Sequence, residues 1–282
     1  MALNRCHQIK ETTISDTALI VYDHPLSPYG QKVKIALLEK GVPFDAPLPE
    51  GIGSGAIVDE FIRASPRGEV PALVEGDNVR VFDSTVILEY IEDRWPEPAL
   101  LPTQAQDRAR VRMLEDTMDT HFEAITWGLS EVRYFGRAEG DLADRIENNA
   151  SNQIQGWYRW LTDQLGDRLW FNGSEFGWGD LAVVPFVNGA VGFGFGPQGR
   201  LADWLARSNQ RDSVRHCREA AEAVAFDGSN TNLDDLKAAV AAGLFKREYR
   251  DHRLEWMIKS GGLSVVESGL TNDNIRFTDV FR

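Results

Sequence analysis

ALIVYDHPLSPYGQKVKIALLEKG, residues 18–41, is the stretch that decides how the chain begins to fold. Its first eight residues are mostly β-branched, aliphatic or aromatic and end in a turn, which is typical of a strand. Ser27 is a good helix N-cap, Pro28 stands at the favoured first helical position, and Gly41 suits the position after a helix end. The stretch therefore predicts a strand over 18–25 and then a short helix that begins at Ser27.

A second stretch, RGEVPALVEGDNVRVFDSTVILEYIEDRWP at residues 67–96, continues the same kind of pattern. A strand entered through Pro71 and the alternating VRVFDS at 79–84 are separated by a Gly-Asp-Asn turn, which predicts a hairpin. The helix that follows is expected to be capped by Ser84 and ended by Pro96.

Between these stretches, PFDAPLP at 43–49 is interpreted as another strand, and residues 50–66 as a loop with an irregular helix. The resulting order is a βαβ unit, an irregular helix and a ββα unit. We therefore predict an α/β domain over residues 18–97, preceded by a polar tail at 1–17.

The remainder, residues 98–282, is predicted to be all-helical after a linker at 100–108. Apolar residues recur at spacings of three and four along two long segments, so two long antiparallel helices are expected. The apolar residues of the first segment are Val111, Leu114, Met118, Phe122, Ile125, Leu129 and Val132. Those of the second segment are Ile146, Ala150, Ile154, Trp157, Leu161 and Leu165. Further helices are predicted from about 176 and at 200–208, 213–224, 233–246 and 250–258. A C-terminal extension follows after about 225, and its polar end, 259–282, either wraps the domain or hangs free.

Composition narrows the possible partners and location. The formal net charge of −13 disfavours nucleic acid and membranes as partners. The two cysteines, Cys6 and Cys217, form neither a disulfide framework nor a metal-binding pattern, so no metal is expected. The first 17 residues contain no apolar signal region, and no apolar run reaches the ~20 residues of a membrane span. The cytoplasm is therefore the expected location.

Three elements of the predicted α/β domain point to one binding site. A helix N-terminus offers unpaired N–H groups and a partial positive charge, so it attracts anions. At Ser27 a suitable anion is a thiolate, because a hydroxyl that donates a hydrogen bond lowers a thiol pKa. At Ser84 it is a carboxylate, and Asp83 suits the ammonium group of the same amino acid. A cis bond between Val70 and Pro71 would turn the Val70 N–H and C=O outward to pair with an extended peptide.

The segments SPYGQKVKIALLEKG, RGEVPALVEG and DSTVILEYIEDRWP resemble those of the glutathione transferases, in the same order and at matching spacing. The likeness covers residues 18–97 well and continues more loosely to about 225. It implies an α/β thioredoxin-like domain followed by an all-α domain, glutathione as co-substrate and a homodimer. It also implies that Ser27 is the catalytic residue, which stabilises the glutathione thiolate. The glutathione-binding residues that the resemblance implies are Val70, Pro71, Asp83 and Ser84.

Two departures from the family pattern concern the site and the helical domain. The family usually supplies a basic or polar side chain after its second strand for the glycine carboxylate of glutathione, but GIGSGAIVDE contains no lysine. Arg63 and Arg67 are the candidates that remain. The usual hydroxyl N-cap of the helical domain is replaced by Gly177, whereas Asp180 can still accept from the N-cap N–H.

Several residues have two readings from the sequence alone. Ser27 serves equally as an ordinary N-cap, and Tyr22 is the rival thiol-activating residue, although its place inside an apolar strand favours core packing. Tyr29, Phe122 and Trp127 are candidates for an apolar substrate pocket, but aromatic residues on a helical stripe are commonly core residues.

The predicted function is therefore a glutathione transferase that adds glutathione to a small electrophilic, apolar substrate, with the thiolate stabilised by Ser27. Two alternatives stay open. One is glutathione-dependent cleavage of aryl ethers, as in the β-etherases that share this fold. The other is a protein of the same fold that binds glutathione or another ligand without turnover.

Overall fold

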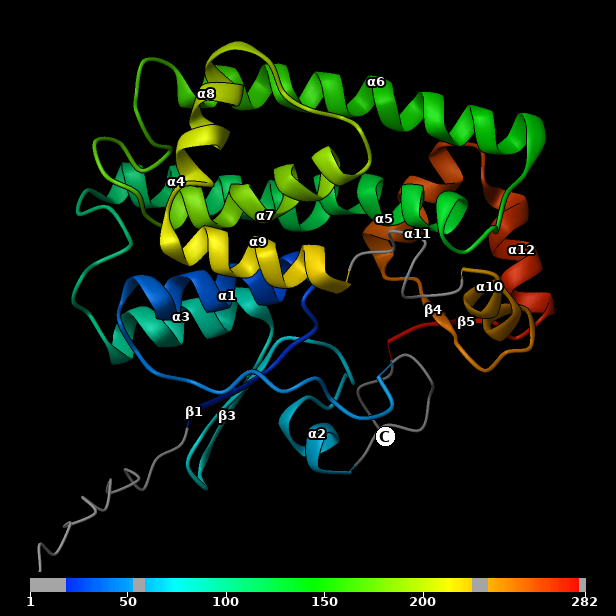
Figure 1. Ribbon diagram of the computed structural model, residues 1–282, viewed down its shortest axis with the longest axis horizontal. Coiled ribbons are helices and arrows are strands. Elements are labelled where there is room, and N and C mark those ends of the chain that lie inside the picture. Colours follow the sequence, from blue (N-terminus) through cyan, green and yellow to red (C-terminus); the bar gives the residue numbers. More distant parts are fainter. Residues whose placement is uncertain (1–18, 53–58, 225–232, 279–282) are drawn as a thin grey trace, which may run out of the picture.

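The computed structural model describes residues 19–52, 59–224 and 233–278 (Figure 1). The predicted N-terminal tail and Cys6 lie outside the described residues. Among the described residues, none of the helices combines the length and apolar character needed to cross a bilayer.

The α/β part contains β1 (Leu19–Tyr22), α1 (Pro28–Glu39), α2 (Asp59–Ala64), β2 (Ala72–Glu75), β3 (Val79–Phe82) and α3 (Ser84–Arg94). Its three strands form an antiparallel sheet in the order β1-β2-β3, so the predicted hairpin is confirmed. Helices α1 and α3 lie side by side on one face of the sheet, and α2 lies against the other (Figure 1).

The strand predicted over 43–49 is wrong. This segment runs beside β1 and makes a single parallel bridge, between Ile20 and Asp45. Asp45 exchanges backbone hydrogen bonds with Leu19 and Val21 at 2.9 and 2.8 Å. Prolines occupy positions 43, 47 and 49 and have no N–H to donate, so the ladder cannot continue.

The helical part contains α4 (Ala105–Thr117), η1 (Met118–Phe122), α5 (Glu123–Arg133), α6 (Gly140–Leu165), α7 (Trp178–Gly192), α8 (Gly199–Ser208) and α9 (Asp212–Val224). The first predicted long helix exists as three consecutive pieces, because η1 is a π-helical turn between α4 and α5. Its start at Ala105 falls inside the expected linker. The apolar helix α7 is buried along most of its length and packs against both α1 and α4, so it joins the two parts.

The C-terminal extension, residues 233–278, folds into α10 (Leu233–Ala241), β4 (Arg247–Glu248), α11 (Asp251–Lys259), α12 (Leu263–Thr271) and β5 (Ile275–Arg276). Strands β4 and β5 pair in parallel, so the prediction that 98–282 is all-helical is wrong for these short strands. Helix α11 packs along α5 (Figure 1). The polar stretch after 259 therefore wraps the molecule. Its polar composition hid this because only a few residues, including Val265, Val266 and Ile275, carry the packing.

Two buried acids of α5 hold the extension in place. The Glu123 carboxylate lies 2.6 Å from Nη2 of Arg253, and the Glu131 carboxylate accepts hydrogen bonds from Arg247 and from the Tyr249 hydroxyl. Both acids are almost fully buried. Breaking such a pair would leave an uncompensated buried charge, so these contacts fix the position of the extension.

Asn172 takes over the role of the missing hydroxyl cap at the start of α7. Its side-chain oxygen accepts the Gly179 N–H at 3.0 Å, and its amide group donates to the Leu100 carbonyl at 2.7 Å. The predicted partner of the cap is present, since Asp180 accepts the Gly177 N–H at 3.2 Å. A Cβ on Gly177 would lie 2.0 Å from Nδ2 of Asn172 and 2.5 Å from the Leu100 oxygen. Glycine is therefore required here, and a serine would not fit.

Restoring the hydroxyl cap with Gly177→Ser is expected to destabilise the protein by about 1–3 kcal/mol, because the new side chain overlaps Asn172 and Leu100. Chemical denaturation measures the free energy of unfolding. The double variant Gly177→Ser/Asn172→Ala should recover part of this loss, because it removes one of the two clashing groups. A single Gly177→Ser variant as stable as the wild type would contradict the assignment.

Gly128→Ala is expected to loosen the extension, because a Cβ at this position of α5 would lie 2.0 Å from the Trp256 ring of α11. The cost should be about 1–3 kcal/mol, with faster proteolysis of residues 233–278. Gly156→Ala in α6 is the matched control. The nearest atom to its added Cβ, Nη2 of Arg159, is at an ordinary contact distance of 3.8 Å, so its stability should hold or rise.

Candidate functional site

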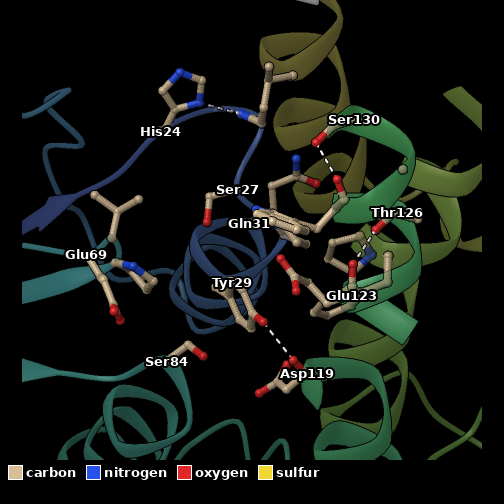
Figure 2. Close-up of a pocket in the computed structure, with 18 of the residues that line it drawn as sticks. His24, Ser27, Tyr29, Gln31, Glu69, Ser84, Asp119, Glu123, Thr126 and Ser130 are labelled. Carbon is tan, nitrogen blue, oxygen red and sulfur yellow. Dashed lines mark hydrogen bonds between the residues drawn. The ribbon is translucent and has the colours of Figure 1, made fainter. Parts of the chain in front are cut away.

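A cavity of about 1180 Å³ opens between the α/β part, helices α4, α5 and α7, and the C-terminal extension (Figure 2). The five residues predicted to bind and activate glutathione, Ser27, Val70, Pro71, Asp83 and Ser84, all line it. Figure 2 shows Ser27 and Ser84 on one side of the cavity and residues of η1 and α5 on the other, and residues of the extension also line it. The chain therefore brings the predicted residues together at a single place.

Ser27 is the N-cap of α1, as predicted. Its Oγ accepts the Gly30 N–H at 3.2 Å, and its backbone is extended. Among the described residues its hydroxyl proton has no acceptor, so it is available to a ligand. Gly30 is required beneath it, because a Cβ there would lie 1.5 Å from the Asp23 carboxylate, which pairs with Lys34 at 2.5 Å. The turn thus presents the hydroxyl and the open N-terminus of α1 to the cavity.

The peptide bond between Val70 and Pro71 is cis. No backbone hydrogen bond engages Val70 within the part of the chain that the structure describes, and β2 begins only at Ala72. Both backbone groups of Val70 are therefore free for an extended ligand beside the sheet, which is the arrangement that strand addition requires.

Asp83, and not Ser84 as predicted, caps α3. Its Oδ1 accepts the N–H groups of Thr85 at 3.1 Å and Val86 at 3.4 Å. Its φ of 76° lies in the left-handed region, which a short acidic residue tolerates better than most. Ser84 is instead the first helical residue, with a nearly buried side chain. Both residues still mark the positive end of α3, where a carboxylate is stabilised.

The two candidate arginines for the glycine carboxylate lie elsewhere. Arg67 Nη1 is 3.5 Å from Oδ2 of Asp83, at the end of the site predicted for the γ-glutamyl group. Arg63 is exposed on α2 and does not line the cavity.

A buried ionic cluster that the sequence analysis missed lies behind the N-terminus of α3. Nζ of Lys32 lies 2.7 Å from the Glu115 carboxylate and 2.6 Å from that of Asp119. Glu115 also accepts from the Thr85 hydroxyl at 2.9 Å and from the Trp178 indole at 2.6 Å. The available signal was the spacing of two acids, four apart, within the apolar stripe at 111–132, which calls for a buried cation.

Burial raises the pKa of Asp119 to about 7, even though Lys32 opposes the shift. The charge of Glu115, which shares the same buried cation, adds to the increase. The Tyr29 hydroxyl is bound to the backbone oxygen of the same residue at 2.7 Å (Figure 2). Burial also raises the pKa of Tyr29 well above its usual value. Tyr29 therefore lines the cavity as a cross-link to η1.

The predicted pocket aromatics have different outcomes. Trp127 lines the cavity, with the edge of Tyr249 against its ring at 4.6 Å between centroids. Phe122 does not line it, because it points into the core, fully buried against Tyr158. The apolar pattern at 111–132 could not predict which of the two faces the cavity, because a π-turn changes the direction of successive side chains. Tyr22 packs against Phe61 and is also outside the cavity lining.

The remaining wall is charged and comes from the extension. Burial alone would raise the pKa of Glu123, but Arg253 and His252 outweigh it and hold this pKa at about 2. Nε2 of His252 lies 3.2 Å from the same carboxylate. The deep side of the cavity thus combines apolar rings with paired charges.

Comparison with known proteins agrees with this arrangement. Residues 21–99 match the family model of the glutathione S-transferase N-terminal domain. A probable glutathione S-transferase, GSTU1, of Oryza sativa subsp. japonica is 30% identical over 215 residues, which are 70% of this chain and 87% of that protein. A stringent starvation protein A homolog of Coxiella burnetii is 35% identical over 176 residues, 60% of this chain and 74% of that protein.

The solved structure of rice GST1 in complex with glutathione is 28% identical, with a TM-score of 0.63 over 79% of this chain and 97% of that one. A thioredoxin-like domain followed by a helical region is the architecture of the glutathione S-transferases, and the predicted fold class is confirmed. The chain belongs to the glutathione S-transferase family.

Asp119→Asn is expected to flatten the pH dependence of stability. The native pKa of about 7 lies above the ordinary 3.8, so the native state holds a proton that the unfolded chain loses first. The contribution of Asp119 to stability is therefore fully present below pH 4 and is lost as the pH rises toward 7, by about 2–4 kcal/mol.

Denaturation between pH 5 and 8 measures this slope. Asp116→Asn, an exposed position on the preceding turn, is the control and should keep the wild-type slope. An Asp119→Asn variant with an unchanged slope would show that another group is responsible.

Proposed function

We propose that this protein is a glutathione transferase in which Ser27 stabilises the thiolate of bound glutathione for attack on an electrophilic, apolar substrate. The observation that carries the proposal is the meeting of three elements on one side of the cavity. They are the hydroxyl at the start of α1, the unpaired backbone of Val70 before a cis proline, and the start of α3 at Asp83–Ser84. Family membership supports glutathione as the peptide.

Each element matches one part of the tripeptide. Val70 would exchange two backbone hydrogen bonds with the cysteinyl residue. The N-terminus of α3 would hold the γ-glutamyl carboxylate, and Asp83 the adjacent ammonium group. The Ser27 hydroxyl would donate to sulfur, and the dipole of α1 would favour its negative charge.

The reaction follows from a thiolate held in this position. Sulfur forms a bond to the electrophilic carbon, and the bond from that carbon to its leaving group breaks, so the leaving group departs with the electron pair. The thiol proton passes to solvent. The substrate would lie against Trp127, Phe186 and Phe193, the apolar side of the cavity.

The rival activating residues are less suited to the role. Tyr29 donates its hydroxyl proton to the Asp119 backbone oxygen, and Tyr22 packs against Phe61 outside the cavity lining. Both positions favour Ser27.

Ser27→Ala is expected to lower kcat/KM with chlorodinitrobenzene about 10- to 100-fold and to raise the pKa of bound glutathione, because one hydrogen bond to the thiolate is lost. Ultraviolet absorbance of the bound thiolate measures that pKa. Ser27→Asp separates capping from activation. Aspartate caps a helix as well as serine, so stability should hold, but its charge opposes the thiolate and activity should fall further.

The alternatives are distinguished by an assay on the wild-type protein. Capture on immobilised glutathione is followed by turnover with aryl halides, activated alkenes and aryl ethers. Turnover confined to aryl ethers would identify an etherase, and capture without any turnover would identify a binding protein. A Ser27→Ala variant with full activity would remove Ser27 from the mechanism in either case.

A further inference from the structure

Val70 determines which way a thiol tripeptide runs through the cavity. A residue that exchanges both backbone hydrogen bonds with one partner forms an antiparallel pair, in which the residue after one member faces the residue before the other. A cysteinyl residue paired with Val70 therefore has its glycine neighbour beside Glu69 and its γ-glutamyl neighbour beside Pro71. The sheet agrees with this direction, because Ala72 pairs with Phe82, which brings Pro71 next to Asp83.

Glu69 is an unfavourable neighbour for a glycine carboxylate. It lines the cavity (Figure 2), and its side chain is 17% exposed. The described residues of the segment after α1, 43–52, contain Asp45 and Glu50 but neither lysine nor arginine. Two carboxylates at close range repel each other, so the glycine end requires a cation from another part of the chain.

The C-terminal extension delivers cations to this position. Nη1 of Arg250 lies 3.3 Å from Oε2 of Glu69, and the Thr278 hydroxyl donates to Oε1 at 2.8 Å. Arg250 lines the cavity with 30% of its side chain exposed. Among the described residues, its guanidinium donates one hydrogen bond, to Glu69. Its remaining N–H groups can donate hydrogen bonds to a second carboxylate.

The charged groups around Glu69 can stabilise one more anion. The carboxyl group of Glu248 neighbours that of Glu69. Burial and the Glu69 contact raise the pKa of Glu248 to about 7. Two arginines, Arg250 and Arg276, face this pair. When Glu248 holds its proton, two arginines face one carboxylate, and an incoming carboxylate would balance the remaining positive charge.

We propose that the C-terminal extension completes the glutathione site, with Arg250 as the residue that binds the glycine carboxylate. This assignment rests on the proposed function, since it requires that the peptide pair with Val70. The extension is then part of the substrate site, and the basic residue absent from 43–52 is supplied from about 200 positions further along the chain.

The test compares glutathione with its glycine monoethyl ester, in which an ethyl group replaces the terminal charge, by titration calorimetry on the full chain. The wild type should bind the free acid about 10- to 100-fold more tightly than the ester. Arg250→Gln should lose this preference by weakening binding of the acid, while its affinity for the ester stays unchanged. Arg215→Gln, an exposed arginine of α9 outside the cavity lining, is the matched control and should keep the preference.

Glu69→Gln gives a second reading if Arg250→Gln does not fold. It keeps Arg250 and removes the opposing carboxylate, so the preference for the free acid should increase severalfold. A wild type that binds the acid and the ester equally well would overturn the assignment of Arg250. An Arg250→Gln variant that keeps the preference for the acid would also overturn it, as would a Glu69→Gln variant with an unchanged preference. Wild-type protein that binds neither ligand would refute the proposed function itself, and the assignment of Arg250 with it.

Discussion

The architecture depends on one buried lysine. Lys32 lies on the helix that begins at Ser27, and its fully buried ammonium group meets the carboxylates of Glu115 and Asp119 from α4 and η1. Thr85 of α3 and Trp178 of α7 complete the same cluster. Any other register would leave these charges buried without partners, so the cluster favours the one in which they meet. The cavity between them therefore has a defined shape.

The site is assembled from three parts of the chain that differ in how strongly local sequence determines them. The starts of α1 and α3 are set by short signals around Ser27 and Asp83. The cavity lining that includes Trp127 depends on how α5 packs. The lining around Glu69 depends on the extension, which reaches Glu69 through Arg250 and Thr278. Recognition of the proposed peptide would thus rely on local backbone geometry at one end and on long-range packing at the other.

This division explains what the sequence could predict. A serine before a proline, an alternating hairpin and a valine–proline step are local patterns, so the helix at Ser27, the hairpin and the peptide groove were predictable. Asn172 as a substitute cap, the Lys32 cluster and the role of Arg250 involve partners 7 to 181 positions apart, which no local pattern encodes. The strand at 43–49 was wrongly expected for a local reason. The composition of this segment is typical of a strand, but its prolines have no N–H groups to donate to a neighbouring strand.

The π-turn at Met118–Phe122 links the substrate wall to the C-terminal packing. It accommodates one residue more than an α-helical turn, and the bulge absorbs that residue locally. If the same residues formed a continuous α-helix, everything downstream would turn by about 100°, and Glu123 and Trp127 would leave the cavity together. The π-turn therefore sets the substrate wall and the attachment of the extension at once, whereas substitutions at either place act separately.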